Sequence, residues 1–201
     1  MDPIAAARKA FADGRKPWAP SDGSHLAAFR KMQQDKNTQI PCGRPRDLEE
    51  PIPVTLFHPV FGQFVDDCQT GTMTEGDNQF AGKLASVMSN SCLNGAQRVR
   101  GVDEVFKSVH INFNILQNIP TTNYVMDASL SAGGPDLPPY CIAEVKNKGA
   151  NNDSEPYIQA VGCYLEATRK YAPNLSKCAL PCFLLVAFGL YSSFLFLRFW
   201  Y

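Results

Sequence analysis

The stretch from Leu180 to Phe188 is an almost unbroken run of apolar residues, without the alternation of a strand that has one wet face. A strand of this kind has to be buried on both faces, as central strands of α/β sheets are. A helical pattern capped by Ser154 and running to about Tyr171 precedes the run, with Pro156 in its first turn, where proline is favoured. The run therefore predicts a buried central strand next to a helix, and hence an α/β layer.

Two further strands are predicted upstream of this helix, over Tyr124–Leu130 and Pro139–Lys146, because each is a short apolar segment beside turn residues. If the strand ending at Lys146 runs parallel to the apolar strand, the connection between them should be right-handed. Earlier in the chain, residues 54–67 predict an extended entry followed by a helix, and helical periodicity predicts two further helices over 75–90 and 96–110, the first of these two capped by Thr74. The predicted fold class is α/β (α+β mixed), with N-terminal helices followed by a β-β-α-β core.

Composition divides the chain into three parts. Residues 1–50 contain short helical patterns separated by proline-rich segments, and we expect a loosely packed extension or linker there. Residues 51–190 form the predicted folded domain. Residues 191–201 are an apolar tail, which we expect to be the truncated remainder of a sheet that is incomplete at its C-terminal end.

Charge and cysteine content limit the classes of function. Lys+Arg and Asp+Glu both number 19, so the formal net charge is zero, which argues against strong non-specific binding of nucleic acid. The chain has no glycine-rich phosphate loop, no dinucleotide fingerprint and no kinase catalytic motifs. Its seven cysteines are scattered and no apolar signal core opens it, which indicates a reduced, intracellular location in cytoplasm or nucleus.

Two acidic residues and one lysine are candidates for a hydrolytic site. Glu144 and Lys146 are two residues apart on a predicted strand, so their side chains should point to the same face. If the strand carrying Asp127 pairs beside them, two carboxylates and one ammonium converge. Carboxylates suit Mg²⁺, which is bound by one or two of them together with waters and substrate phosphates. The lysine could hold a water that attacks a phosphate through its ammonium form, or deprotonate that water through its neutral amine.

The order Asp127…Glu144-Val145-Lys146, followed by a helix that contains Gln159, resembles the PD-(D/E)XK nuclease superfamily. More narrowly, the chain resembles the nuclease-like module that precedes kinase-like domains in fungal protein families. The resemblance spans about residues 51–190 and is carried by three segments, AEVKNKG at 143–149, DSEPYIQA at 153–160 and HPVFGQFVDD at 58–67.

The resemblance implies a function and a set of residue roles. Asp127, Glu144 and the backbone carbonyl of Val145 would bind Mg²⁺ or Mn²⁺, and Lys146 and Gln159 would complete the catalytic site for cleaving nucleic acid. Asp66 or Asp67 would be a further acidic ligand from an early helix. A kinase-like domain is the partner implied by the family, and it is absent from this sequence. One branch of the family has a tyrosine four positions after the glutamine, where this chain has Cys163 and then Tyr164.

Three other interpretations remain open. Asp127 could cap a turn, and Glu144 and Lys146 could be a surface ion pair that contributes about 0–1 kcal/mol. The domain could be a catalytically inactive nuclease fold that acts as a regulatory or recognition module beside a kinase-like protein. Finally, residues 181–197 carry no charge and approach the length of a membrane span, so a C-terminal anchor is an alternative to a strand, although proline at position 181 disfavours it.

Overall fold

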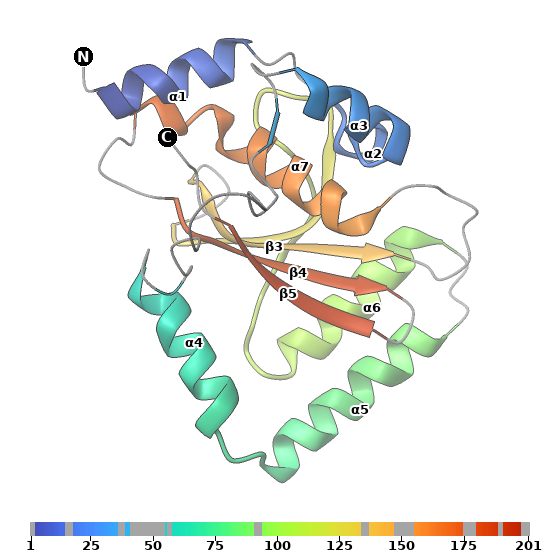
Figure 1. Cartoon of the computed structure of the whole chain (residues 1–201). Helices are drawn as coiled ribbons and strands as arrows, with labels where there is room; N and C mark the ends of the chain where they lie inside the picture. Colours follow the sequence, from blue (N-terminus) through green and yellow to red (C-terminus); the bar gives the residue numbers. More distant parts are fainter. Residues whose placement is uncertain are drawn as a thin grey trace.

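The structure is a computed structural model of the 201-residue chain. It describes residues 3–14, 18–35, 39–40, 55, 58–90, 94–133, 137–146, 155–174 and 180–188, and the backbone of residues 191–197. Helices lie on both sides of one mixed sheet (Figure 1). The predicted mixed α/β class is therefore confirmed.

Within the described residues, the sheet has five strands in the order of the chain, β1-β2-β3-β4-β5. β1 to β3 form an antiparallel meander, β3 and β4 are parallel, and β5 returns antiparallel to β4. The strands are β1 (Asn114–Asn118), β2 (Val125–Ser131), β3 (Pro139–Lys146), β4 (Cys182–Phe188) and β5 (Tyr191–Leu197). The prediction of β2, β3 and a central β4 parallel to β3 is confirmed.

Strand β1 was not predicted, because its sequence lacks the alternation that marks a strand. Leu116 has a left-handed backbone with φ of 51°, and both Ile115 and Leu116 pack against the same core. The register with β2 is the same on both sides of Leu116, so this residue interrupts the alternation of side chains without adding a residue to the strand.

The three helices predicted between residues 54 and 110 are present as α4 (Pro59–Thr70), α5 (Glu75–Ser89) and α6 (Gly95–Lys107). Thr74 begins α5 with a capping box, in which its hydroxyl accepts from the Asp77 N–H and the Asp77 carboxylate accepts from the Thr74 N–H. The second half of the capping box was not anticipated, because Asp rather than the more usual Glu or Gln occupies its acidic position.

The N-terminal residues pack against the domain instead of forming a loose extension. They form α1 (Pro3–Gly14), α2 (Pro20–Gly23) and α3 (Leu26–Gln34), and α2 lies directly on α7 (Pro156–Arg169). The Glu155 N–H donates to the Ser24 carbonyl at 3.0 Å, and Phe11 of α1 packs against the core beneath α7. Residues 41–50, the rest of the predicted extension, lie outside the described residues.

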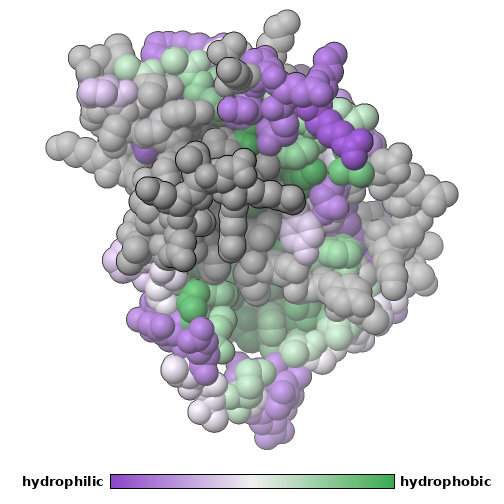
Figure 2. Space-filling view, viewed as in Figure 1, coloured by the Kyte–Doolittle hydropathy of each residue, from purple (hydrophilic) through white to green (hydrophobic). Residues whose placement is uncertain are grey.

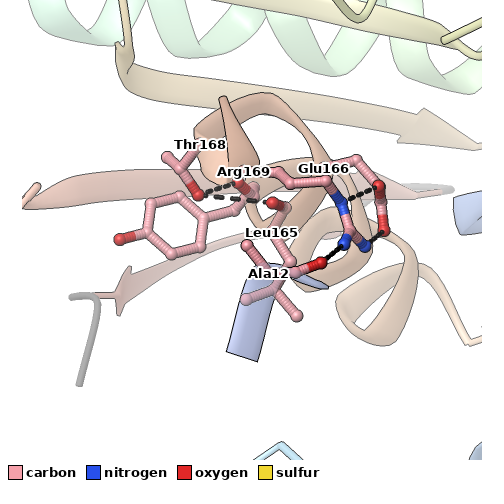
Figure 3. A network of polar contacts seen from close by, with 6 residues as sticks. Ala12, Leu165, Glu166, Thr168 and Arg169 are labelled. Carbon is pink, nitrogen blue, oxygen red and sulfur yellow. Dashed lines mark hydrogen bonds and ion pairs between the residues drawn. The ribbon is translucent and has the colours of Figure 1, made fainter. Parts of the chain in front are cut away.

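Polar contacts fix both ends of α7. Its N-cap is Glu155, whose side chain accepts from the Tyr157 N–H; the predicted cap, Ser154, lies outside the described residues. Near its C-terminal end, the Arg169 guanidinium donates two hydrogen bonds to the Glu166 carboxylate, from Nε to Oε2 at 2.9 Å and from Nη2 to Oε1 at 2.8 Å. The same guanidinium donates to the carbonyl of Ala12 in α1 (Figure 3). Helix α7 is thus held in place by the N-terminal helices at both ends.

The sheet separates two cores. On one face, α7 covers Ile142, Leu184 and Val186, and on the other face α5 and α6 cover Ala143, Val145 and Leu185. Helix α4 packs on this second face, where Phe61 meets Phe183 with ring centroids 5.4 Å apart. Figure 2 shows hydrophobic residues gathered in the hollow between α4 and α5, below the sheet.

The apolar C-terminal segment pairs with the sheet. Residues 191–197 form β5, with Leu184 opposite Leu195 in the register, so part of the predicted tail is an edge strand. No helix within the described part of the chain is long and apolar enough to cross a membrane.

Candidate functional site

The candidate site forms where β2 and β3 stop pairing through their backbones. Regular pairing reaches Ala128 opposite Ala143. Beyond this point the Val145 N–H donates to the Asp127 carboxylate, with 2.9 Å between N and Oδ2. Because the N–H and C=O of one strand residue point to the same side of the strand, the Val145 carbonyl is also directed toward β2. The structure therefore brings Asp127 beside the backbone of Val145.

Glu144 and Lys146 form an ion pair on the face of β3 that α7 covers. The Lys146 Nζ lies 2.7 Å from Glu144 Oε1. The Glu144 side chain is only 1% exposed, whereas that of Lys146 is 35% exposed. This pair is therefore not the surface ion pair considered above: its carboxylate is in the core and its ammonium reaches the surface.

The two carboxyl groups repel each other when both are charged. Burial and the negative charge of Asp127 raise the pKa of Glu144 to about 8, against the opposing effect of Lys146. Burial also raises the pKa of Asp127, although the hydrogen bond from Val145 and the charge of Lys146 counteract the shift. Two carboxylates beside one ammonium leave one negative charge, which a proton or a bound cation can neutralise.

Lys146 remains protonated in this environment. Burial lowers the pKa of Lys146, but the charge of Glu144 and its hydrogen bond outweigh burial, so the net shift is upward. A lysine in this state can donate hydrogen bonds to a water or to a phosphate oxygen, but it is poorly suited to removing a proton. Of the two roles expected for Lys146, holding a water is the one that a protonated side chain can perform.

Cys163 is a further member of the site, contributed by α7. Its Sγ lies 4.0 Å from Glu144 Oε2, and its side chain is fully buried. Burial raises the pKa of the Cys163 thiol well above its usual range, with the charge of Glu144 adding to the effect. Sequence reasoning identified this position only as a departure from a family tyrosine; the spacing of one helical turn from Gln159 could have placed it near the site.

Gln159 lies on α7 one turn before Cys163 and is 7% exposed. Because β3 and β4 are parallel and α7 connects them, α7 runs back along β3, and Gln159 lies toward the end of β3 that carries Lys146. The structure thus places Gln159 on the covering helix beside the Glu144 face.

Asp66 and Asp67 are not brought to this site. Both are exposed on α4, where the Asp67 Oδ1 accepts from the Gln63 side chain at 2.7 Å. Helix α4 packs through Phe61 against Phe183, on the face of the sheet opposite α7. The expected acidic ligand from this helix is therefore separated from Glu144 by the sheet, because the helix docks through its aromatic residues.

The donor set suits a hard divalent cation. The described residues contain no group of three or more His, Cys, Asp or Glu side chains placed to hold a metal. Mg²⁺, however, commonly takes only one or two carboxylates and completes its shell with waters and phosphates. Asp127 and Glu144, with their one uncompensated negative charge, meet that requirement.

Comparisons of the chain with known protein families, with curated proteins and with solved structures found no match.

Proposed function

We propose that this chain is a Mg²⁺- or Mn²⁺-dependent nuclease-like hydrolase of nucleic-acid phosphodiesters. The observation that carries the proposal is the convergence of two acidic side chains and one ammonium, Asp127, Glu144 and Lys146, beside the C-terminal end of β3. Ligands of α/β sheets bind outside the carboxyl ends of parallel strands, and β3 and β4 are parallel here. The succession β2-β3-α7-β4 agrees with the PD-(D/E)XK core that the sequence resembles.

Each residue has a role that follows from its position. Asp127 and Glu144 would hold the cation, with the Val145 carbonyl as a third contact. When bound, the cation supplies charge to the phosphate oxygens and lowers the pKa of a bound water. The protonated Lys146 donates a hydrogen bond that orients the attacking water or neutralises a phosphate oxygen. Gln159 and Cys163 lie on the helix that closes this face, and keep the carboxyl groups away from bulk water.

The first test is a calorimetric titration of the wild type and the Glu144→Gln variant with Mg²⁺ and Mn²⁺. Glutamine keeps the shape of the buried side chain while removing its charge, so we expect a folded protein that no longer binds the cations. Glu104→Gln is the matched control, because its side chain is 72% exposed on α6, away from β3. Loss of binding only in Glu144→Gln supports the site. Equal binding in all three proteins would contradict it.

The second test measures cleavage of single- and double-stranded DNA and RNA. We expect Lys146→Met to lower the rate by roughly 100- to 1,000-fold, which is typical of removing one group that stabilises developing charge. Circular dichroism checks that the variant is folded. Unchanged cleavage in folded Lys146→Met would exclude Lys146 from the reaction.

A catalytically inactive module is the second candidate, and one observation favours it. Asp127 accepts the Val145 N–H where backbone pairing stops, so it has a structural role that needs no metal. The zero net charge also fits a domain that recognises a protein, such as the kinase-like partner implied by the resemblance. A folded wild type that binds neither Mg²⁺ nor Mn²⁺ would select this function over hydrolysis.

A further inference from the structure

Two aromatic side chains lie beside Lys146 on the same face of the sheet. Lys146 is opposite Phe188 in the parallel register of β3 and β4. Neighbouring strands are about 4.8 Å apart, so the two residues are direct neighbours at the end of the sheet. Phe188 packs with the core on the α7 face, the face to which Lys146 also points.

Tyr157, in the first turn of α7, completes this aromatic pair. Its ring meets that of Phe188 edge-on, with centroids 6.2 Å apart and planes at 82°. Both side chains are partly buried, so each keeps part of its surface exposed to solvent. The acidic residue Asp127 comes from β2, on the other side of β3, so the aromatic pair and Asp127 flank the Glu144–Lys146 pair from opposite sides.

We infer that the ring of Tyr157, braced edge-on by Phe188, is a stacking platform for a nucleobase next to the phosphate that Lys146 contacts. This inference rests on the proposed function and adds the substrate class: a single strand, whose unpaired bases can stack on aromatic rings. Base–aromatic stacking tolerates any base and contributes about 1–3 kcal/mol per base. A lysine beside an aromatic side chain can pair with a phosphate of the nucleic acid while a base stacks on the ring. This combination suits single-stranded nucleic acid.

Fluorescence anisotropy can test the inference without mutation. A short labelled single strand is compared with an abasic strand of the same length and charge, in deoxyribose and in ribose form, with Ca²⁺ in place of Mg²⁺. We expect the base-containing strand to bind about tenfold more tightly in at least one series, and the tighter series identifies the sugar. Equal binding of base-containing and abasic strands would overturn the platform but leave phosphate recognition intact. A duplex of the same length serves as a third probe: binding of the duplex alone would overturn the platform but not the proposed function, whereas binding of none of the three would overturn both.

Variants of Tyr157 test whether this residue is responsible for the preference for the base-containing strand. Tyr157→Leu keeps an apolar side chain against the core but removes the ring, and should abolish the preference for the base-containing strand. Tyr157→Phe keeps the ring and should retain the preference. Tyr140→Leu is the matched control, because Tyr140 is 45% exposed near the other end of β3. A preference that survives in Tyr157→Leu, or is lost equally in Tyr140→Leu, would overturn the assignment.

Discussion

At the scale of single residues, the site depends on how charge is distributed between the core and the surface. Glu144 is buried, while Lys146, two residues later, reaches the surface and neutralises the buried carboxylate from there. Asp127 accepts the N–H of Val145, and its negative charge opposes ionisation of Glu144. Isolated charges in a core are unfavourable, so burial and Asp127 raise the pKa of Glu144 to about 8, and a bound cation would favour the ionised form of Glu144.

We expect the metal-free protein to lose stability as the pH rises from about 5 to 8. The pKa of Glu144 is about 8 in the folded protein and 4.5 in its ordinary state. Between these values the folded protein binds one more proton than the unfolded chain, so the free energy of unfolding decreases as pH increases. The raised pKa of Lys146 affects stability only above its ordinary value of 10.5. Denaturant titrations at several pH values measure this dependence.

The Glu144→Gln variant is the control for this pH dependence. It has no carboxyl group at position 144, so the decrease in stability over this range should become shallower. The raised pKa of Asp127 has the same sign and should leave a smaller slope, beginning at lower pH. Identical slopes in the wild type and the variant would show that Glu144 does not titrate in this range.

At the scale of elements, α7 is the helix on which the site depends. It carries Gln159 and Cys163, and the N-terminal helices fix it from outside. Gly162 allows this contact, because a Cβ at that position would lie 3.2 Å from the Cβ and 3.3 Å from the Cα of Pro20 in α2. The close approach of α2 therefore requires a residue without a side chain at position 162.

We expect Gly162→Ala to lower the free energy of unfolding, although alanine is the better helix former. Alanine in an open helical position gains about 1 kcal/mol over glycine. At Gly162 the contact with the Pro20 ring and backbone should outweigh that gain. Gly82→Ala in α5 is the matched control, because a Cβ there meets nothing within 4 Å, and it should be stabilising. Equal stabilisation by both substitutions, measured by denaturant titration, would show that α2 does not sit closely on α7.

At the scale of the whole molecule, helices cover both faces of the sheet, and the central strand β4 contributes to two separate cores. Leu184 is fully buried under α7, and Leu185 is 2% exposed under the helices of the opposite face. The two successive residues therefore stabilise different halves of the molecule.

Leu184→Ala and Leu185→Ala should each lower the free energy of unfolding by about 2–5 kcal/mol, because each leaves a cavity in a packed core. Leu137→Ala is the control: the residue is 47% exposed, and its substitution should change stability by less than about 0.5 kcal/mol. Denaturant titration of the three variants measures these changes. A cost below about 1 kcal/mol at either core position would show that one face of the sheet is not covered in solution.

The sequence by itself determined the elements whose signals are local. The apolar run at Leu180–Phe188 predicted β4, Thr74 predicted the start of α5, and a two-residue spacing placed Glu144 and Lys146 on one face. Periodicity and capping depend on residues close together in the chain, so they can be read without knowing the fold.

Only the tertiary structure decided how distant segments meet. It placed Asp127 on the Val145 N–H, Cys163 against Glu144 and α2 on Gly162. It also placed Asp66 and Asp67 on the helix that packs on the opposite face of the sheet. The N-terminal segment, expected to be loosely packed, instead packs on α7. These contacts depend on strand register, the end of backbone pairing and helix docking, which join residues far apart in the chain and leave no local pattern in the sequence.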